Sequence, residues 1–301
     1  MKNTKLPKVL FVVGPTTSHK TRLGIEIAKK FNGEIINADA FQVYADMSIG
    51  TNAPTRKELK QAKFHLNQFL KLTDVWDIKK FQTLAIKIIA DIVKRKKLPI
   101  VIGGSNLYVD ALINNYDLSN GGRTNEYDDL TNEQLYEELY SLSRKDALNI
   151  GRNNRKRLLR ALQVIKSRKS KNALRAKNKR LYDYLLIECN YSSRQALYDS
   201  INAKVDEMFA AGWVSEVKKI AKKYKNIDLM NNNAFKALGY RDILCALEND
   251  EEVNISLIKQ KIRHFAKRQI TWIKNKYPSH LLYVQNNKVQ IFKDIEKWLK
   301  K

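Results

Sequence analysis

Cysteine and long apolar runs are both scarce in this sequence of 301 residues. Its 2 cysteines, Cys189 and Cys245, are far apart and form no metal-binding pair, so we expect reduced thiols in an intracellular protein. No segment approaches the roughly 18 apolar residues that a membrane-spanning helix needs. The apolar stretch VLFVV near the N-terminus is too short for a signal peptide. We therefore expect a cytoplasmic protein with no membrane partner.

Acidic residues are also few relative to basic ones. The chain has 31 Asp and Glu against 56 Lys and Arg, which gives a formal net charge of +25. Such an excess favours a polyanionic partner, and nucleic acid is the first candidate. The alternative is a general over-use of Lys and Asn without a nucleic-acid partner. Hydrophobic residues make up 44% of the chain, enough for a real core, which argues against global disorder.

Short apolar runs alternate with helical patterns in the first third of the chain. Strands are predicted at 9–13, 34–37 and 99–103, and amphipathic helices at 20–31 and 81–94. This alternation is typical of a doubly wound parallel sheet. Ligands of such sheets bind at the carboxyl ends of the strands, where Gly14, Asp39 and Gly103 fall.

The pattern changes after Leu112. Residues 114–125 have the composition of a linker, and about 130–180 are predicted to be wholly helical and strongly basic. A strand at 185–188 and helices at 193–223 and 253–276 follow. We therefore expect an α/β fold, a P-loop NTPase-like parallel sheet flanked by helices with a small all-helical insertion. The predicted core comprises 1–112 and 181–301, and the predicted insertion 113–180.

The segment GPTTSHKT, residues 14–21, lies between the first strand and the first helix and is nearly a Walker A pattern. The backbone N–H groups of such a loop wrap phosphate oxygens, Lys20 would neutralise phosphate charge, and the Thr21 hydroxyl would ligate Mg²⁺. His19 stands where the pattern has glycine. Its side chain would either crowd the phosphate or add a donor. The alternative is a chance strand–helix loop. The predicted phosphate ligands are Gly14, Thr16, Thr17, Ser18, His19, Lys20 and Thr21.

Two further polar residues follow predicted strands. Asp39 could hold Mg²⁺ through water or accept a proton from a nucleophile, although it could equally be a satisfied turn or capping residue. Ser105, after Gly103 and Gly104, offers a hydroxyl at the third strand end. These residues alone leave open whether the reaction is phosphoryl transfer or another.

The order and spacing of six motifs over residues 8 to 275 resemble the tRNA dimethylallyltransferase family. They are GPTTSHKT, NADAFQVYADMSIGT, PIVIGGSNLYVDAL, RNNRKRLLRALQV, ALGY and AKRQITW. The last of these and the pair DAFQVY and IGGSNLY are the most specific. The phosphate loop alone would not distinguish the family.

The resemblance implies transfer of a dimethylallyl group from dimethylallyl diphosphate to the exocyclic amine of the adenosine 3′ of the tRNA anticodon. Asp39 would be the general base, and Lys20 and the loop amides would hold the diphosphate. Thr21 would bind Mg²⁺. The hydroxyl of Ser105, which stands where threonine is usual, would reach the metal or the bridging oxygen. Arg241, together with Lys236, would stabilise the leaving diphosphate, so Asp39, Ser105 and Arg241 are the catalytic candidates.

The same resemblance implies that the target base is flipped out of its stack. Gln42 and Tyr44 would lie near that base, and Phe81, Tyr108 and Trp272 are aromatic candidates for stacking or for the prenyl pocket, although core packing is the more common role. The remaining candidates for contacts with tRNA, whose alternative is a solvated helix face, are Arg155, Arg157, Arg160, Lys267 and Arg268.

Several positions depart from the family pattern. They are His19 for glycine, Ala40 for a hydroxyl residue, the absence of a lysine before Pro54, Asn154 for Asp and Gln163 for Glu. Loss of the two carboxylates could leave nearby arginines unpaired. We expect a divergent, active, monomeric enzyme. Two alternatives stay open: a tRNA-binding homologue with impaired catalysis, and a small-molecule P-loop kinase that binds ATP.

Overall fold

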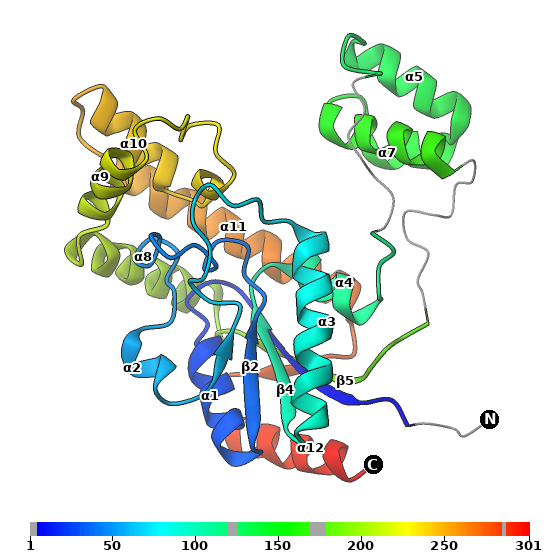
Figure 1. The fold of residues 1–301 in the computed structure, drawn as a ribbon, viewed down its shortest axis with the longest axis vertical. Helices are drawn as coiled ribbons and strands as arrows, with labels where there is room; N and C mark the ends of the chain where they lie inside the picture. Colours follow the sequence, from blue (N-terminus) through cyan, green and yellow to red (C-terminus); the bar gives the residue numbers. More distant parts are fainter. Residues whose placement is uncertain (1–4, 119–125, 169–178, 285–286) are drawn as a thin grey trace. The chain divides into compact units, whose positions relative to one another are not determined.

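The computed structural model describes residues 5–118, 126–168, 179–284 and 287–301 (Figure 1). Its centre is a six-stranded, entirely parallel sheet in the order β3-β2-β4-β1-β5-β6. The expected α/β class with a parallel sheet is therefore confirmed. The strands are β1 (Lys8–Val13), β2 (Gly33–Asn37), β3 (Phe64–His65), β4 (Leu98–Gly103), β5 (Asp183–Cys189) and β6 (Leu281–Tyr283).

Helices cover both faces of this sheet (Figure 1). Along β1, Val9, Phe11 and Val13 pack into the core beneath α3, while Leu10 and Val12 pack into the core that contains α1. This alternation explains why the strand is a continuous apolar run. The helices of this part are α1 (Lys20–Lys30), α2 (Arg56–Leu59), α3 (Ile78–Lys94), α4 (Asn106–Ile113), α8 (Arg194–Ala210), α9 (Trp213–Lys223), η2 (Ala234–Lys236), α10 (Tyr240–Glu248), α11 (Ile255–Lys276) and α12 (Lys288–Lys300).

The predicted elements are present, with several differences. The helical stretch expected over 193–223 is two helices, because Gly212 adopts a left-handed conformation with φ 94° between α8 and α9. The strands β3 and β6 and the helices α2, α4, α10 and α12 were not predicted. β6 has only three residues, and its pairing with β5 is decided by tertiary contact. No helix in the described ranges combines the length and apolarity needed to cross a membrane.

Residues Asn114–Arg180 form a separate compact unit, distinct from Met1–Ile113 with Leu181–Lys301. Its helices are α5 (Asn132–Leu142), α6 (Arg144–Ile150) and α7 (Arg155–Arg168). Leu135, Leu139, Leu158 and Leu162 form its own small core. The stretch expected to be wholly helical is thus broken at Ser143 and again at 151–154. Residues 169–178 of the basic segment, and 119–125 of the expected linker, lie outside the described ranges.

A buried carboxylate in β2 links β3 to the turn between α3 and β4. Glu34 in β2 is 1% exposed and accepts hydrogen bonds from Arg95, from Lys97 at 2.9 Å and from the His65 ring at 2.8 Å. The Arg95 guanidinium, with help from His65 and Lys97, holds the pKa of this carboxyl well below its usual range. Removing a carboxylate from such a cluster leaves the cations without their shared partner.

Replacing Glu34 by Gln should lower the free energy of unfolding by roughly 3 kcal/mol at neutral pH. Because the pKa is depressed in the folded protein, the stabilisation is complete above the unfolded value of about 4.3 and is lost as pH falls below it. Urea unfolding of wild type and Glu34→Gln at neutral and acidic pH should therefore show a converging difference. The matched control is Asp91→Asn, an exposed partner of the same Arg95, which should change little. An equal effect of both substitutions would contradict the role of burial.

Candidate functional site

A cavity of about 910 Å³ opens beyond the carboxyl ends of β1, β2 and β4. Its walls come from the phosphate loop, the segment after β2, residues 50–55, helix α8, residues 236–238 and helix α11. Five basic side chains line it (Lys20, Arg22, Lys204, Lys236 and Arg268) against three acidic ones (Asp39, Glu58 and Glu207). The cavity therefore favours an anionic ligand.

The phosphate loop is packed closely against the sheet. Gly14 has φ 143°, and a Cβ there would lie 2.2 Å from the Cys189 carbonyl oxygen of the neighbouring strand, so only glycine fits. Gln269 in α11 accepts a hydrogen bond from the Thr16 amide at 3.3 Å and donates to the Gly104 carbonyl at 2.8 Å. One buried amide thus joins the loop to the end of β4. The motif AKRQITW contains this residue, but its role was not predicted.

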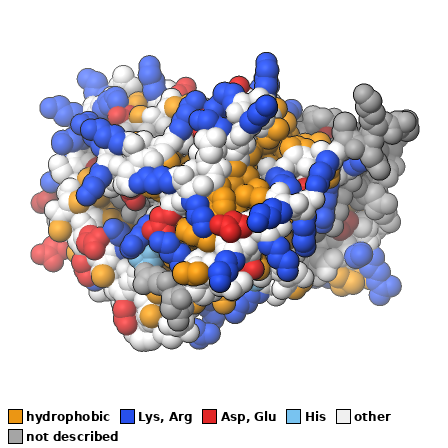
Figure 2. All heavy atoms as spheres, turned by 90° about the horizontal axis from the view of Figure 1, so that it is seen from below, with side chains coloured by type: hydrophobic (Ala, Val, Ile, Leu, Met, Phe, Trp, Pro, Cys, Tyr) orange, Lys and Arg blue, Asp and Glu red, His pale blue; other side chains and the backbone are white. Residues whose placement is uncertain are grey.

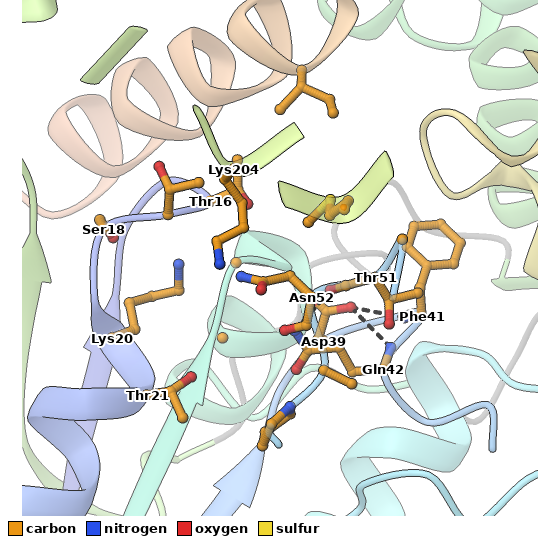
Figure 3. A pocket seen from close by; sticks show the side chains of 18 of the residues that line it. Thr16, Ser18, Lys20, Thr21, Asp39, Phe41, Gln42, Thr51, Asn52 and Lys204 are labelled. Atoms are coloured by element: carbon orange, nitrogen blue, oxygen red, sulfur yellow. Dashed lines mark hydrogen bonds between the residues drawn. The ribbon is translucent and has the colours of Figure 1, made fainter. Parts of the chain in front are cut away.

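Lys20 begins helix α1 and carries its ammonium group toward the cavity (Figure 3). The group donates to the Pro15 carbonyl at 2.5 Å, which holds it over the loop. Burial lowers the pKa of Lys20 to about 8, with Cys189 and Asp39 opposing the shift. The Thr21 hydroxyl follows on the first turn of the same helix and also lines the cavity.

His19 occupies the N-cap of α1 in a left-handed conformation, φ 60°. Thr17 in the loop also has a left-handed backbone conformation, with φ 65°. This region costs a residue with a Cβ roughly 1–2 kcal/mol, which explains why phosphate loops prefer glycine here. The His19 imidazole is exposed and packs against the Tyr191 ring at a centroid distance of 5.8 Å. Burial of part of the ring, together with Arg22 and Lys20, lowers the pKa of His19, which favours its neutral form.

Asp39 follows β2 and faces the same cavity (Figure 3). Its Oδ1 accepts hydrogen bonds from the backbone N–H groups of Phe41 at 2.8 Å and Gln42 at 3.2 Å. Asp39 therefore does stabilise a turn, the alternative role considered for it. Within the described residues, only one of its two carboxylate oxygens accepts a hydrogen bond. Burial raises the pKa of Asp39, and the two backbone donors oppose this. A recessed carboxylate with a raised pKa is suited to accept a proton.

Ser105 stabilises the turn that follows Asp39 through a hydrogen bond to its backbone. Its Oγ accepts a hydrogen bond from the Ala40 N–H at 3.0 Å, and it does not line the cavity. Gln42 also has a positioning contact, because its side-chain amide donates to the carbonyl oxygens of Thr51 and Asn52, each at 3.0 Å. These contacts join the general-base candidate to residues 51–52, which also line the cavity.

Glu216 holds the preceding residues of that segment. Its carboxylate accepts from the backbone N–H groups of Ser48 at 2.9 Å and Ile49 at 2.8 Å, and from the Tyr240 hydroxyl at 2.6 Å. Tyr240 is fully buried at the start of α10, so the carboxylate connects α10 to the wall of the cavity. No sequence pattern indicated this role, because a glutamate in a helix resembles any solvated helix residue.

The remaining cationic candidates divide into two groups. Lys236 lines the cavity and donates to the Asn233 side chain. Arg241 is not among the lining residues; its Nη2 lies 3.5 Å from the Asn232 carbonyl, and its buried Nε has no hydrogen-bond partner among the described residues. Lys204 of α8 lines the cavity, with its ammonium group toward Lys20 (Figure 3), and was not predicted.

The aromatic candidates lie mainly in the core. Phe81 is fully buried and stacks on Tyr108 at 4.6 Å, and Tyr44 is 2% exposed. Trp272 packs against Tyr277 at 5.9 Å and does not line the cavity. Core packing, the alternative considered for these rings, describes what they do here. The apolar part of the cavity wall instead includes Phe41, Val205, Met208, Leu238, Ile262 and Phe265.

The basic candidates outside the cavity differ in their contacts. Lys267 is exposed and Arg268 lines the cavity. In the helical unit, Arg157 is exposed, whereas the Arg155 guanidinium donates to the Leu130 carbonyl and to the Asp128 carbonyl at 2.6 Å.

Position 154 has Asn where Asp was expected, but Arg155 still has hydrogen-bond acceptors in the Leu130 and Asp128 carbonyl oxygens. The Asn154 side chain itself accepts from the Arg157 N–H at 3.4 Å at the start of α7. Arg160 and Gln163 also have partners. On the face in Figure 2, Lys and Arg side chains are spread over most of the surface, with fewer acidic side chains between them.

The sequence matches a family model described as IPP transferase over residues 42–276. It is 42% identical over 273 residues to a tRNA dimethylallyltransferase from Malacoplasma penetrans, covering 90% of each chain. A tRNA dimethylallyltransferase from Staphylococcus aureus is 36% identical over 309 aligned positions, with 97% of each chain covered. Both of these alignments cover more of the chain than the family model does.

Two solved structures are also similar to this chain. The crystal structure of a tRNA isopentenylpyrophosphate transferase from Staphylococcus epidermidis has a TM-score of 0.70 at 32% identity and covers 97% of this chain and 99% of its own. A eukaryotic dimethylallyltransferase described as acting on tRNA has a TM-score of 0.79 at 27% identity, covering 89% of this chain and 70% of its own.

Lys20 should lose its charge as pH rises through about 8. We expect the affinity for inorganic pyrophosphate, measured by calorimetry, to fall by up to about tenfold for each pH unit above that value. In Lys20→Arg the cation stays protonated, so this variant separates the lysine from the ionisation of pyrophosphate itself. Parallel pH profiles for wild type and Lys20→Arg would contradict a lowered pKa for Lys20.

Proposed function

The chain belongs to the IPP transferase family, and we propose that it transfers the dimethylallyl group of dimethylallyl diphosphate to the N6 amine of the tRNA adenosine 3′-adjacent to the anticodon. The observation that carries this proposal is one cavity containing a phosphate loop with Lys20, the carboxylate of Asp39 and an apolar wall. These three features correspond to the diphosphate, the amine and the five-carbon group. We further propose that the protein acts as a cytoplasmic monomer.

In the proposed reaction, the N6 nitrogen forms a bond to the prenyl carbon as the bond from that carbon to the diphosphate oxygen breaks. Asp39 accepts the proton that the amine loses. Lys20, the loop amides and Lys236 stabilise the negative charge that develops on the departing diphosphate, and we propose that Arg241 contributes to this stabilisation. Holding donor and acceptor in one cavity supplies much of the remaining acceleration.

The residues present fit a magnesium ion bound together with the diphosphate. Mg²⁺ prefers oxygen ligands and is commonly held by one or two protein groups plus substrate phosphates. Thr21 offers such an oxygen in the cavity, and no group of three His, Cys, Asp or Glu residues in the described ranges could form an all-protein site. Bound there, Mg²⁺ would neutralise part of the diphosphate charge. The Ser105 hydroxyl would act through the Asp39 turn.

Recognition of tRNA is proposed to use several basic residues, with Gln42 and the 51–52 segment near the accepted base. Lys267 and Arg268 on α11, with Arg157 and Arg160 on α7, would contact phosphates or flanking bases. Arg268 is the member of this set that also lines the cavity. The net charge of +25 supports a substantial electrostatic contribution to binding.

The reaction is tested by incubating the protein with Mg²⁺, dimethylallyl diphosphate and unmodified tRNA, followed by mass spectrometry of the nucleosides. Prenylated adenosine should appear in wild type and be formed about 10²–10⁴-fold more slowly by Asp39→Asn, because loss of a general base has that effect. Asp46→Asn is the control, since Asp46 pairs with Lys223 outside the cavity. Because burial raises the pKa of Asp39, the wild-type rate should rise with pH as that carboxyl deprotonates.

Absence of product with tRNA still bound would support the impaired homologue instead. Phosphate transfer from ATP without any need for tRNA would support a kinase.

Two neighbouring arginines should separate tRNA contact from structure. Arg157→Ala should weaken tRNA binding and reduce the salt slope by about one, without changing unfolding. Arg155→Ala should destabilise the helical unit, because two backbone carbonyls lose their donor. Filter binding at several salt concentrations and thermal unfolding make the comparison. An unchanged salt slope in Arg157→Ala would remove this residue from the proposed interface.

A further inference from the structure

Tyr191, between β5 and α8, joins the phosphate loop to helix α8. Its hydroxyl lies 2.7 Å from the Thr17 carbonyl oxygen, 2.6 Å from Ser200 Oγ and 3.2 Å from His19 Nε2. A carbonyl oxygen can only accept, so the single phenolic proton goes to Thr17. The Tyr191 oxygen must then accept from Ser200 and from His19. This arrangement places the proton of the neutral imidazole on Nε2.

The two residues that Tyr191 contacts in the loop both have unfavourable backbone conformations. Thr17 and His19 have φ values of 65° and 60°, in the left-handed region that residues with a Cβ seldom adopt. Such conformations persist only where surrounding contacts hold them. Tyr191 supplies those contacts, one to the Thr17 backbone and one to the His19 side chain. A glycine at position 19 would remove the strain and the side-chain contact together.

The same contact fixes α8 relative to the loop. Ser200 and Lys204 lie four residues apart in α8, so they share one helix face, and both line the cavity. The Lys204 ammonium group points toward that of Lys20 (Figure 3) and pairs with Glu207 of the same helix at 2.6 Å. A shift of α8 would therefore move one cation away from the other.

We propose that His19, Tyr191 and Ser200 form a clamp that preorganises the phosphate loop and sets Lys204 as a second cation on the donor diphosphate. In an ordinary Walker A loop, glycine adopts the left-handed conformation without strain. In this chain the clamp stabilises that conformation instead, and His19 is a positioning residue. The inference rests on the proposed function. It adds three positioning residues to that function, and one lysine that binds the diphosphate of the donor.

The test measures Kd for inorganic pyrophosphate with Mg²⁺ by calorimetry, and KM for dimethylallyl diphosphate and for tRNA. His19→Gly and Tyr191→Phe should each raise the pyrophosphate Kd about 3- to 10-fold, as expected for lost hydrogen bonds and lost preorganisation. The double variant should be weaker by less than the product of the two effects, because both belong to one network. Lys204→Gln should raise the same Kd roughly tenfold. The KM for tRNA should stay within about twofold.

Tyr198→Phe is the matched control. Tyr198 lies in the same helix, and its hydroxyl makes no hydrogen bond to the described residues. Circular dichroism and thermal unfolding establish that each variant is folded. Equal or tighter pyrophosphate binding by His19→Gly would show that the imidazole obstructs the loop, which would overturn the clamp. The same conclusion follows if the His19→Gly and Tyr191→Phe effects multiply fully. Failure of wild type to bind pyrophosphate or to form prenylated adenosine would instead reject the proposed function, and the clamp with it.

Discussion

The position of strand β1 between β4 and β5 is the constraint on which the site depends. Parallel pairing on both sides brings three strand ends to one edge of the sheet. The chain leaves that edge through Gly14, where the Cys189 carbonyl allows no side chain. A side chain at Gly103 would likewise clash with the carbonyl oxygen of Ala38, the residue before Asp39. Close backbone packing thus sets the distance between the phosphate loop and the carboxylate.

Burial at this edge acts on two opposite charges. It lowers the pKa of Lys20 and raises the pKa of Asp39, so each group is brought nearer to neutral pH. A lysine that remains charged binds the anion, while a carboxylate with a raised pKa is a stronger base. The cost of recessing both groups is offset by specific partners, the Pro15 carbonyl for Lys20 and two backbone N–H groups for Asp39.

Hydrogen bonds made by buried and half-buried polar side chains hold the walls of the cavity. Gln269 connects the phosphate loop to β4, Glu216 connects α10 to residues 48–50, and Gln42 connects Asp39 to residues 51–52. Each is a side chain whose hydrogen bonds go mainly to backbone groups of another segment. Such contacts fix geometry at a modest net gain in stability.

Local sequence pattern determined the main strands, the phosphate loop and the place of Asp39, because buried parallel strands and loop motifs depend on residues close in the chain. The motif resemblance determined the family. Tertiary structure alone decided that Lys204 enters the cavity, that Phe81 and Tyr108 stack in the core, and that Ser105 supports the Asp39 turn. It also decided that His19 meets Tyr191, 172 residues away, because contacts between distant segments leave no periodic signal in either one.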